Sequence, residues 1–265
     1  MVKPDEMFFE IFGALNGLVK KTFQLIKRPR VVLIIPARNE EKNIARVIKA
    51  GKKSKYVTDI LVVDSFSTDR TVRVAKEVGA KVIKQDPKKS GKGGAIYTGI
   101  KKASGEVLVF MDADIENVRA DMIDKLVKPI IKGEADHVVA KFKRKMGRVT
   151  LLTAKPLLNL YFPEIKLLQH LSGLFAARAY ILRQLEIEEG WGAEVSRVID
   201  IAMKGYRTKE INIGYVAHDS KELKELTPMA EEVAKVILKK AVQYKRTRKK
   251  VKSLLLRKTK NNEGE

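Results

Sequence analysis

The 265-residue sequence predicts an α/β fold built on a mostly parallel, doubly wound sheet. Apolar runs alternate with helical patterns, which is the order that βαβ units produce. The runs at 31–35, 60–63 and 107–111 are uninterrupted, as expected of strands that helices cover on both faces. Polar and acidic residues follow each of these runs. In such a sheet the ligand lies outside the carboxyl ends of the strands, so the three polar clusters should meet at one crevice.

The expected elements follow in chain order. Residues 7–26 place apolar side chains at helical spacing, which predicts an amphipathic helix that either packs on the main domain or lies on an anionic membrane surface. The doubly wound part should have strands at 31–35, 60–63, 81–84 and 107–111, with helices at 41–52, 69–78 and 93–103. A helix at 119–131 and a strand at 137–142 lead into a second half rich in helix. From Met229 a last helix carries an apolar face, formed by Val233, Val236, Ile237 and Ala241.

Charge narrows the choice of partners. The sequence holds 54 Lys and Arg against 32 Asp and Glu, a formal net charge of +22, so we expect an anionic partner. Nucleotide sugars, phosphorylated acceptors, nucleic acid and acidic lipid all meet this condition. The absence of cysteine excludes disulfides, thiolate metal sites and a cysteine nucleophile, and it indicates the cytoplasm. No apolar run of about 18 residues and no signal-peptide pattern occur, so neither a membrane span nor secretion is expected.

The first polar cluster lies at 36–41. Pro36 is expected to end the first strand, and the free N–H groups of the next helix would then point into the crevice. Asn39 and Glu40 could either cap that helix or contact a ligand, and the sequence leaves both roles open.

The second polar cluster lies at 64–69. Ser67 or Thr68 can cap the next helix, and Asp69 suits its first turn, so half of the cluster has a structural explanation. Asp64 and Ser65 are not needed for that role. Because they follow the strand directly, they could hydrogen-bond a base or a ribose.

The segment DPKKSGKGGA at 86–95 sets Lys88, Lys89 and Lys92 among glycines just before a helix. Glycines let the backbone approach an anion, and a lysine there would stabilise a diphosphate. The spacing is not that of a P-loop. A flexible basic turn is the alternative.

Asp112 and Asp114 form the strongest chemical signal. Two carboxylates at i and i+2 on a strand end repel each other unless a cation or a proton lies between them, and hard oxygen ligands suit Mg2+ or Mn2+. Such an ion would neutralise a departing nucleoside diphosphate. The alternative is a surface turn that carries two carboxylates. His218 could also bind the metal as a neutral imidazole, whereas His137 and His170 are expected to be structural.

With these residues in order, the chain resembles nucleotide-sugar glycosyltransferases of the GT-A fold, and among them the glucosyl-3-phosphoglycerate synthases. The segments PARNEE, DSFSTD and DAD are typical of GT-A enzymes in general. The resemblance extends over residues 31–237. The narrower family is indicated by five segments that occur in the family's order: SGKGGA, GRVTLLTAKPLL, LLQHLSGLFAAR, GWGAEV and GYVAHDS. The resemblance implies a GT-A fold with a helical acceptor-side region. It also implies metal-dependent transfer of a hexose from a UDP- or GDP-hexose to 3-phosphoglycerate, with retention and without a covalent enzyme intermediate.

The resemblance also implies a role for each site residue. The nucleoside would be contacted by Pro36, Arg38, Glu40 and Ser65. Lys92 would contact the diphosphate, and Asp112 the ribose or the donor sugar. Asp114 and His218 would bind the metal. The phosphorylated acceptor would be held by Gly147, Arg148 and Thr150, with Arg148 using its fork geometry. Leu171 would act through its main-chain carbonyl near the anomeric centre, and Glu194 would orient hydroxyls or act as a base.

Three parts are expected along the chain: an N-terminal helix at 1–30, a catalytic domain at 31–220 and a basic helical tail at 221–265. Within the domain, residues 31–115 would bind the nucleotide sugar and residues 116–220 the acceptor. Ser172-Gly173-Leu174 and His218-Asp219-Ser220 depart from the family's Gly-Gly-Glu and His-Arg-Asn. Mannosyl transfer, or another phosphorylated acceptor, therefore stays open.

Two other functions fit parts of the sequence. A polyprenyl-phosphate sugar transferase of the same fold would use the N-terminal helix and the basic tail for peripheral contact with a membrane. A non-enzymatic nucleotide or nucleic-acid binder would explain the charge of +22, but no motif supports it, so nucleic acid is not the expected partner. The apolar faces of the terminal helices also make a homodimer an option.

Overall fold

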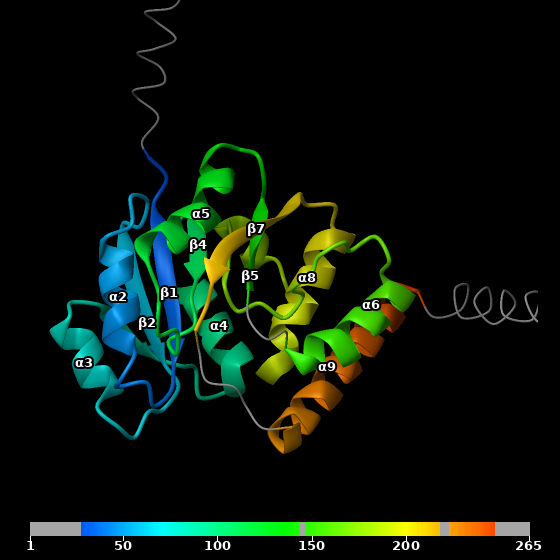
Figure 1. Ribbon diagram of the computed structural model, residues 1–265, viewed down its shortest axis with the longest axis horizontal. Coiled ribbons are helices and arrows are strands. Elements are labelled where there is room, and N and C mark those ends of the chain that lie inside the picture. Colours follow the sequence, from blue (N-terminus) through cyan, green and yellow to red (C-terminus); the bar gives the residue numbers. More distant parts are fainter. Residues whose placement is uncertain (1–27, 144–146, 218–222, 247–265) are drawn as a thin grey trace, which may run out of the picture.

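The computed structural model describes residues 28–143, 147–217 and 223–246. Its centre is a seven-stranded sheet in the order β3-β2-β1-β4-β6-β5-β7 (Figure 1). The strands are β1 (Val31–Ala37), β2 (Asp59–Asp64), β3 (Lys81–Lys84), β4 (Val107–Phe110), β5 (His137–Lys143), β6 (Phe175–Arg178) and β7 (Thr208–Tyr215). Each of the first five overlaps a strand that the sequence predicts.

The sheet is mostly parallel, as predicted. β1 to β4 run in one direction, and β5 pairs in parallel with β7. β6 is antiparallel to both of its neighbours, β4 and β5. From β1 the chain moves outward to β2 and β3 on one side, and it then returns to place β4 on the other side. The carboxyl ends of β1 and β4 therefore form a topological switch point, where a ligand crevice is expected.

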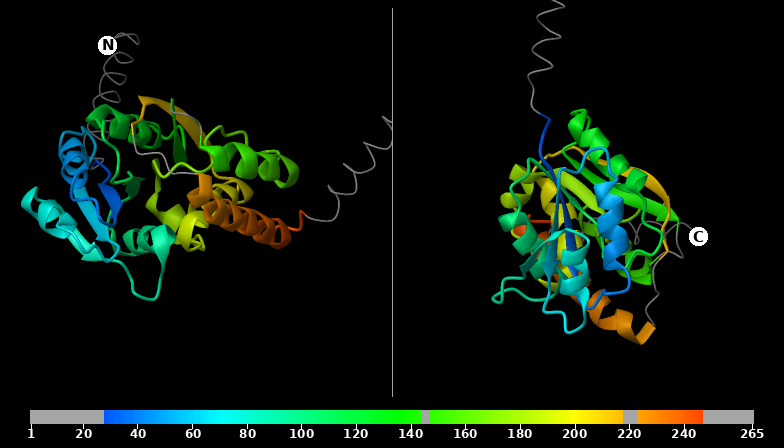
Figure 2. Two further views of the ribbon diagram at one scale, coloured as in Figure 1. Left: turned by 60° about the horizontal axis from the view of Figure 1, so that its bottom comes forward. Right: turned by 90° about the vertical axis from the view of Figure 1, so that its left-hand side faces the viewer.

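Helices cover both faces of the sheet (Figure 2). In chain order they are α2 (Ile44–Lys52), α3 (Thr71–Glu77), α4 (Gly91–Lys102), α5 (Ala120–Ile131), α6 (Lys155–Tyr161), α7 (Ala179–Arg183), α8 (Ala193–Met203) and α9 (Leu223–Gln243), with a π-helical turn at Thr150–Ala154 and a 3-10 turn at Gly190–Gly192. α2, α3 and α5 pack with Val31, Leu33 and Ile35 on one face, and α4 and α7 pack with Val32 and Ile34 on the other. The unbroken apolar run of β1 is therefore buried on both faces.

A helical region formed by α6, α8 and α9 lies beside the sheet and has its own core (Figure 1). The apolar face predicted for the last helix is confirmed, because all four of its residues are buried: Val233, Val236, Ile237 and Ala241. Lys240 is buried as well. Its Nζ lies 2.7 Å from Asp200 Oδ2, and the Tyr244 hydroxyl donates to Asp200 Oδ1 at 2.9 Å. α9 is thus joined to α8 by a buried polar network as well as by apolar packing.

The prediction that Pro36 ends the first strand is wrong. β1 continues through Pro36 to Ala37, and both residues pair with β2. Proline is tolerated here because β4 pairs with β1 only as far as Ile34, so the missing N–H faces a side where the neighbouring strand has ended. The sequence also fails to predict β6, since FAAR is short and contains two alanines, which are depleted in strands.

Residues 1–27 and 247–265 lie outside the described residues, and with them the predicted N-terminal helix and the basic end of the tail. Within the part of the chain that the structure describes, no helix is long and apolar enough to cross a membrane.

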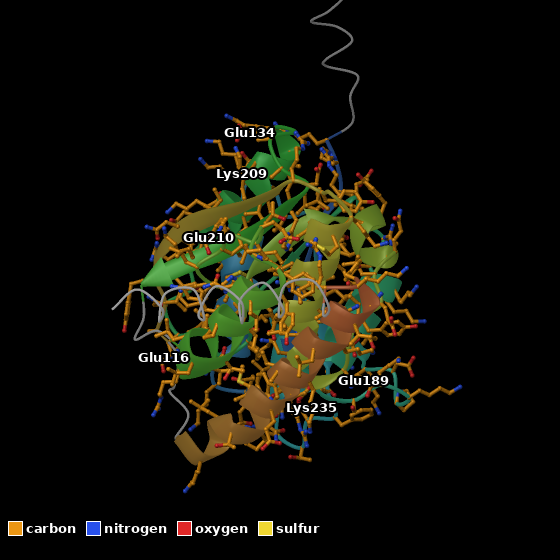
Figure 3. All side chains as sticks on the ribbon, turned by 90° about the vertical axis from the view of Figure 1, so that its right-hand side faces the viewer. Glu116, Glu134, Glu189, Lys209, Glu210 and Lys235 are labelled. Atoms are coloured by element: carbon orange, nitrogen blue, oxygen red, sulfur yellow. The ribbon has the colours of Figure 1, made fainter. Side chains whose placement is uncertain are left out.

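Asp136 ties together three strands of the second half. Its carboxylate accepts the N–H, Nε and Nη2 of Arg207 at 3.0 to 3.1 Å and the Nε of Arg178 at 3.4 Å. Asp136 precedes β5, Arg178 ends β6 and Arg207 precedes β7. A second pair, between Glu134 and Lys209 at 2.8 Å, lies on the surface at the same end of the sheet (Figure 3). Hydrogen bonds from Arg207 hold the pKa of Asp136 below its usual value, although burial acts in the opposite direction.

Asp136→Asn should lower the free energy of unfolding at pH 7 by about 1–2 kcal/mol, because it removes a charged acceptor from four hydrogen bonds. Since the folded-state pKa is depressed, this stabilisation is present above the unfolded pKa of about 3.9 and is lost as the pH falls through the folded value. In urea titrations, the free energies of unfolding of the parent and of Asp136→Asn should therefore differ strongly at pH 7 and only slightly near pH 3. Glu134→Gln, in an exposed pair, is the control and should cost less than about 0.5 kcal/mol. An equal loss from Asp136→Asn at both pH values would contradict this account.

Candidate active site

A cavity of about 1250 Å³ opens at the switch point of the sheet. The predicted site residues that line it are Pro36, Arg38, Glu40, Ser65, Lys92, Asp112, Asp114, Gly147, Arg148, Thr150, Leu171 and Glu194. Asp64 is not among the lining residues, and His218 lies outside the described residues. The strand-end clusters of the first half therefore meet segments of the second half in one place.

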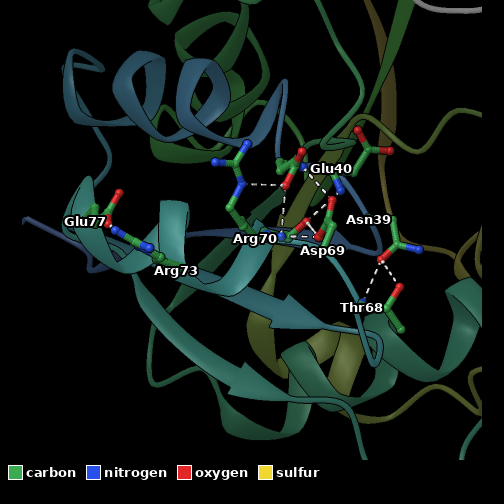
Figure 4. Close-up of polar contacts among 9 residues, drawn as sticks. Asn39, Glu40, Thr68, Asp69, Arg70, Arg73 and Glu77 are labelled. Carbon is green, nitrogen blue, oxygen red and sulfur yellow. Dashed lines mark hydrogen bonds and ion pairs between the residues drawn. The ribbon is translucent and has the colours of Figure 1, made fainter.

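The first two polar clusters are locked to each other (Figure 4). Asn39, which has a φ of 58°, donates its N–H to Ser67 Oγ at 3.0 Å and accepts the N–H of Thr68 on Oδ1 at 2.8 Å. The prediction that Ser67 or Thr68 caps the next helix is therefore wrong. α3 begins after Arg70 without a side-chain cap, and Asp69 supports its start, because Asp69 Oδ1 accepts the N–H of Thr71 at 2.9 Å. The lock holds the ends of β1 and β2 side by side at the cavity.

Asn39 and Glu40 have different roles at the first turn, and neither of them is a helix cap. α2 begins at Ile44 after Asn43, without a side-chain cap, so neither Asn39 nor Glu40 caps it. Asn39 holds the second turn, whereas the half-buried Glu40 lines the cavity. Burial raises the pKa of Glu40, and the nearby charge of Asp114 raises it further.

The acidic end of the cavity suits a hard divalent ion. Asp114 is exposed there, and its charge and that of Asp112 both act on Glu40. A cation would relieve this repulsion, and carboxylate oxygens are the ligands that Mg2+ and Mn2+ prefer. Among the residues that the structure describes, no three His, Asp or Glu side chains are grouped closely enough to complete a metal site. The second predicted ligand, His218, lies outside them.

Gln85 connects the second and third turns, a role that the sequence analysis did not assign. It accepts the Ser65 hydroxyl on Oε1 at 2.7 Å and donates from Nε2 to the carbonyl of Lys89 at 2.6 Å. It follows β3 directly, so the strand-end pattern could have identified it. Asp64 is buried, and its Oδ1 accepts the N–H of Ser67 at 3.2 Å. The carboxylate of Asp64 thus supports the turn that presents Ser65.

Lys92 joins the two halves of the site. α4 begins at Gly91, so Lys92 lies in its first turn. Its Nζ lies 2.7 Å from Asp112 Oδ1 and 2.8 Å from Glu194 Oε1. Burial acts to lower the pKa of Lys92, but attraction to the two carboxylates outweighs it and raises the pKa above the ordinary value. Lys92 is therefore a cation at neutral pH. An ammonium group has three N–H donors, and the two ion pairs engage two of them.

Gly173 is the backbone against which this cluster packs. A Cβ at this position would lie 2.4 and 2.5 Å from the carboxylate oxygens of Asp112 and 2.6 Å from Lys92 Nζ. A side chain at this position would therefore have to push the Asp112 carboxylate or the Lys92 ammonium out of place. The chain just before the 171–174 segment is held from β7, where Glu210 Oε1 accepts the N–H groups of Leu168 and Gln169 at 2.7 and 2.9 Å.

Trp191 is a second lining residue that sequence reasoning missed. It is the only tryptophan of the chain, and its ring centroid lies 5.9 Å from Lys92 Nζ. The segment GWGAEV contributes to the family resemblance, but a lone aromatic in a partly apolar stretch gives the same signal as a core residue. Its position in a short turn before α8, between two glycines, places it on the cavity wall.

Comparisons with known proteins agree with this geometry. The family model for glycosyl transferase family 2 matches residues 32–190. A glucosyl-3-phosphoglycerate synthase from Petrotoga mobilis is 34% identical over 241 residues, which is 81% of this chain and 74% of that protein. The chain belongs to the glucosyl-3-phosphoglycerate synthase family.

Solved structures of this family have the same fold. The Mycobacterium tuberculosis synthase in complex with Mn2+, UDP-glucose and phosphoglyceric acid is 32% identical, with a TM-score of 0.76 over 80% of each chain. The same synthase in complex with Mg2+ and UDP has a TM-score of 0.76 and 32% identity over 80% of this chain and 79% of that one. The predicted GT-A fold is confirmed, and so is the helical region beside the sheet.

Gly173→Ala should reduce glycosyl transfer by a factor of about 100 or more, because the new methyl group must displace Lys92 or Asp112. Initial rates, together with thermal unfolding, measure this effect. Gly133→Ala is the matched control: nothing lies within 4 Å of its new Cβ, but its φ of 69° is unfavourable for alanine. It should lose about 1 kcal/mol of stability while turnover stays at the parent level. Full turnover in Gly173→Ala would show that the Lys92 cluster does not depend on this close contact.

Proposed function

We propose that this protein transfers glucose from UDP-glucose to 3-phosphoglycerate in a reaction that requires Mg2+ or Mn2+. The family relationship supports this function. The observation that carries it is the meeting of Lys92, Asp114 and Arg148 in one cavity. These three side chains are opposite in charge to a diphosphate, a divalent ion and a phosphorylated acid, respectively.

The donor is proposed to lie along the first half of the cavity. Arg38 and Ser65 would contact the nucleoside, and the remaining N–H of Lys92 would point to an oxygen of the diphosphate. Asp114 and His218 would hold the metal, which would neutralise charge on the departing diphosphate. Asp112, fixed by Lys92 at 2.7 Å, would accept a hydroxyl of the ribose or the sugar.

The acceptor is proposed to lie against the 147–150 segment. Arg148 would bind the phosphate or carboxylate of 3-phosphoglycerate through its fork geometry. This contact would hold the far end of the acceptor, so that its hydroxyl meets the anomeric carbon in a reactive position. Glu194 is 2% exposed and fixed by Lys92, so it suits a role in orienting hydroxyls. The main-chain carbonyl of Leu171 would lie near the anomeric centre. Glucose would be transferred with retention of its anomeric configuration and without a covalent enzyme intermediate.

We further propose peripheral membrane contact and a homodimer. Membrane contact is predicted from the N-terminal helix and the basic end of the tail, which lie outside the described residues. The homodimer is predicted from the apolar faces of the terminal helices, but the face of the last helix is buried in the core that α9 shares with α6 and α8, so this proposal rests on the N-terminal helix. Sedimentation with anionic liposomes would test the membrane-surface alternative.

The purified chain, incubated with UDP-glucose, 3-phosphoglycerate and Mg2+, should release UDP and form glucosyl-3-phosphoglycerate, and a chelator should abolish the reaction. Asp114→Asn should lower the rate by about 100-fold or more, because it removes a charged metal ligand but keeps the shape of the side chain. Asp121→Asn, an exposed carboxylate paired with Arg119 and Lys125, is the control and should leave the rate unchanged. Parallel assays with GDP-glucose and GDP-mannose distinguish the donor. Undiminished turnover in the chelator would refute metal dependence.

Arg148→Ala should raise the KM for 3-phosphoglycerate by about 10-fold or more, while the KM for UDP-glucose stays within about twofold. Arg148→Lys should recover only part of the loss, because lysine keeps the charge but cannot form a bidentate contact. Arg46→Ala, an exposed arginine on α2, provides the control. If the acceptor saturated Arg148→Ala as it does the parent, the acceptor site would have to be elsewhere.

A further inference from the structure

Arg197 is a buried cation next to the Lys92 cluster, and no part of the proposed reaction uses it directly. It lies on α8 one turn after Glu194, its side chain is 1% exposed, and it does not line the cavity. Its Nη2 donates to the carbonyl of Ser172 at 3.2 Å. Its guanidinium carbon lies 3.4 Å from the centre of the Phe175 ring, which in turn stacks on Phe110 at 4.4 Å.

This arrangement is costly for stability. Nε and Nη1 of Arg197 are buried without hydrogen-bond partners, and so is Oε2 of Glu194. A buried charge with unmade hydrogen bonds is destabilising, and a hydrophobic side chain of similar volume is often tolerated better in its place. Burial lowers the pKa of Arg197 to about 10, although the charges of Glu194 and Asp112 act against it, so the guanidinium is still charged at neutral pH. Stability alone therefore gives no reason for an arginine here.

Two links connect Arg197 to the site. The first is electrostatic. Asp112, Lys92, Glu194 and Arg197 alternate in charge, and Arg197 partly neutralises the carboxylate of Glu194, which also pairs with Lys92. The second runs through the backbone. The carbonyl that Arg197 holds belongs to Ser172, between Leu171 and Gly173, and this segment packs directly on the cluster. Both links end at the same side chain, Lys92.

Arg197 lies over the face of the Phe175 ring, whereas His137 packs against that ring in an edge-on arrangement and does not compete with the charge of Arg197. The His137 ring is 6.1 Å from that of Phe175, and its Nδ1 is 3.2 Å from Thr208 Oγ1. Burial, and then the charge of Arg197, hold the pKa of His137 well below its ordinary value, so it is neutral. Arg197, one turn after Glu194 on α8, is therefore the buried cation whose charge acts on Glu194.

We propose that Arg197 is a positioning residue for glycosyl transfer, which holds the Glu194 carboxylate against Lys92 and fixes the Leu171–Gly173 backbone at the cavity. The proposal rests on the proposed function. It requires that Arg197 act on the reacting geometry more than on the affinity for either substrate. It also requires that part of its effect pass through the charge of Glu194.

The test is a double-mutant cycle with Arg197→Met and Glu194→Gln, assayed with UDP-glucose, 3-phosphoglycerate and Mg2+. Arg197→Met should lower kcat by about 30-fold or more, while both KM values stay within about threefold. In the Glu194→Gln background the same change should cost less than about threefold, because the carboxylate it acts on is gone. Arg197→Lys, which keeps a charged donor, should recover about 10-fold of the loss in kcat.

Arg183→Met is the matched control, because Arg183 also donates to backbone carbonyls, those of Ala103 and Gly105, away from the cavity. It should leave kcat unchanged. If Arg197→Met does not fold, Arg197→Lys and Arg197→Gln provide the same comparison of charged and neutral side chains. Parent-level kcat in folded neutral variants, or equal losses with and without the Glu194 carboxylate, would overturn the proposal. A parent protein that forms no product would instead refute the proposed function itself.

Discussion

The ion pairs of Lys92 with Asp112 and Glu194 are the interaction on which the rest of the site depends. Asp112 follows β4 in the first half of the chain, and Glu194 begins α8 in the second half, so Lys92 at the start of α4 joins both. Two largely desolvated carboxylates would repel each other without this cation. With this cation in place, Asp112 faces the proposed donor and Glu194 is held by Lys92. One N–H of the ammonium remains for an anionic ligand.

The surrounding structure can be understood as what this arrangement requires. Gly173 has no side chain because any Cβ would meet both Asp112 and Lys92. The lock between Asn39 and Thr68 holds the ends of β1 and β2 together, so the acidic end of the cavity keeps its shape. Burial and the charges of Asp114 and Asp112 raise the pKa of Glu40, which shows that negative charge gathers at this end. A divalent ion would therefore bind where these carboxylates lie.

The sequence predicts the parts of the fold and site that depend on local patterns. Uninterrupted apolar runs locate β1, β2 and β4, and the rule that ligands lie beyond strand ends brings Ser65, Asp112 and Asp114 to one cavity. Contacts between distant residues are not visible in this way. The pairing of Lys92 with Glu194 requires the fold, as does the burial of Lys240 on Asp200, which looks like part of a solvated basic helix in the sequence. Pro36 shows the same limit, because its place within β1 depends on where β4 ends.

A crystal structure of the protein with UDP-glucose and Mn2+ tests the central claim most directly. The account predicts that Lys92 Nζ keeps its contacts with Asp112 and Glu194 while its third N–H lies within hydrogen-bond distance of a donor oxygen, and that Mn2+ binds Asp114. A donor bound in the cavity with Lys92 turned away from either carboxylate, or a metal bound without Asp114, would contradict it.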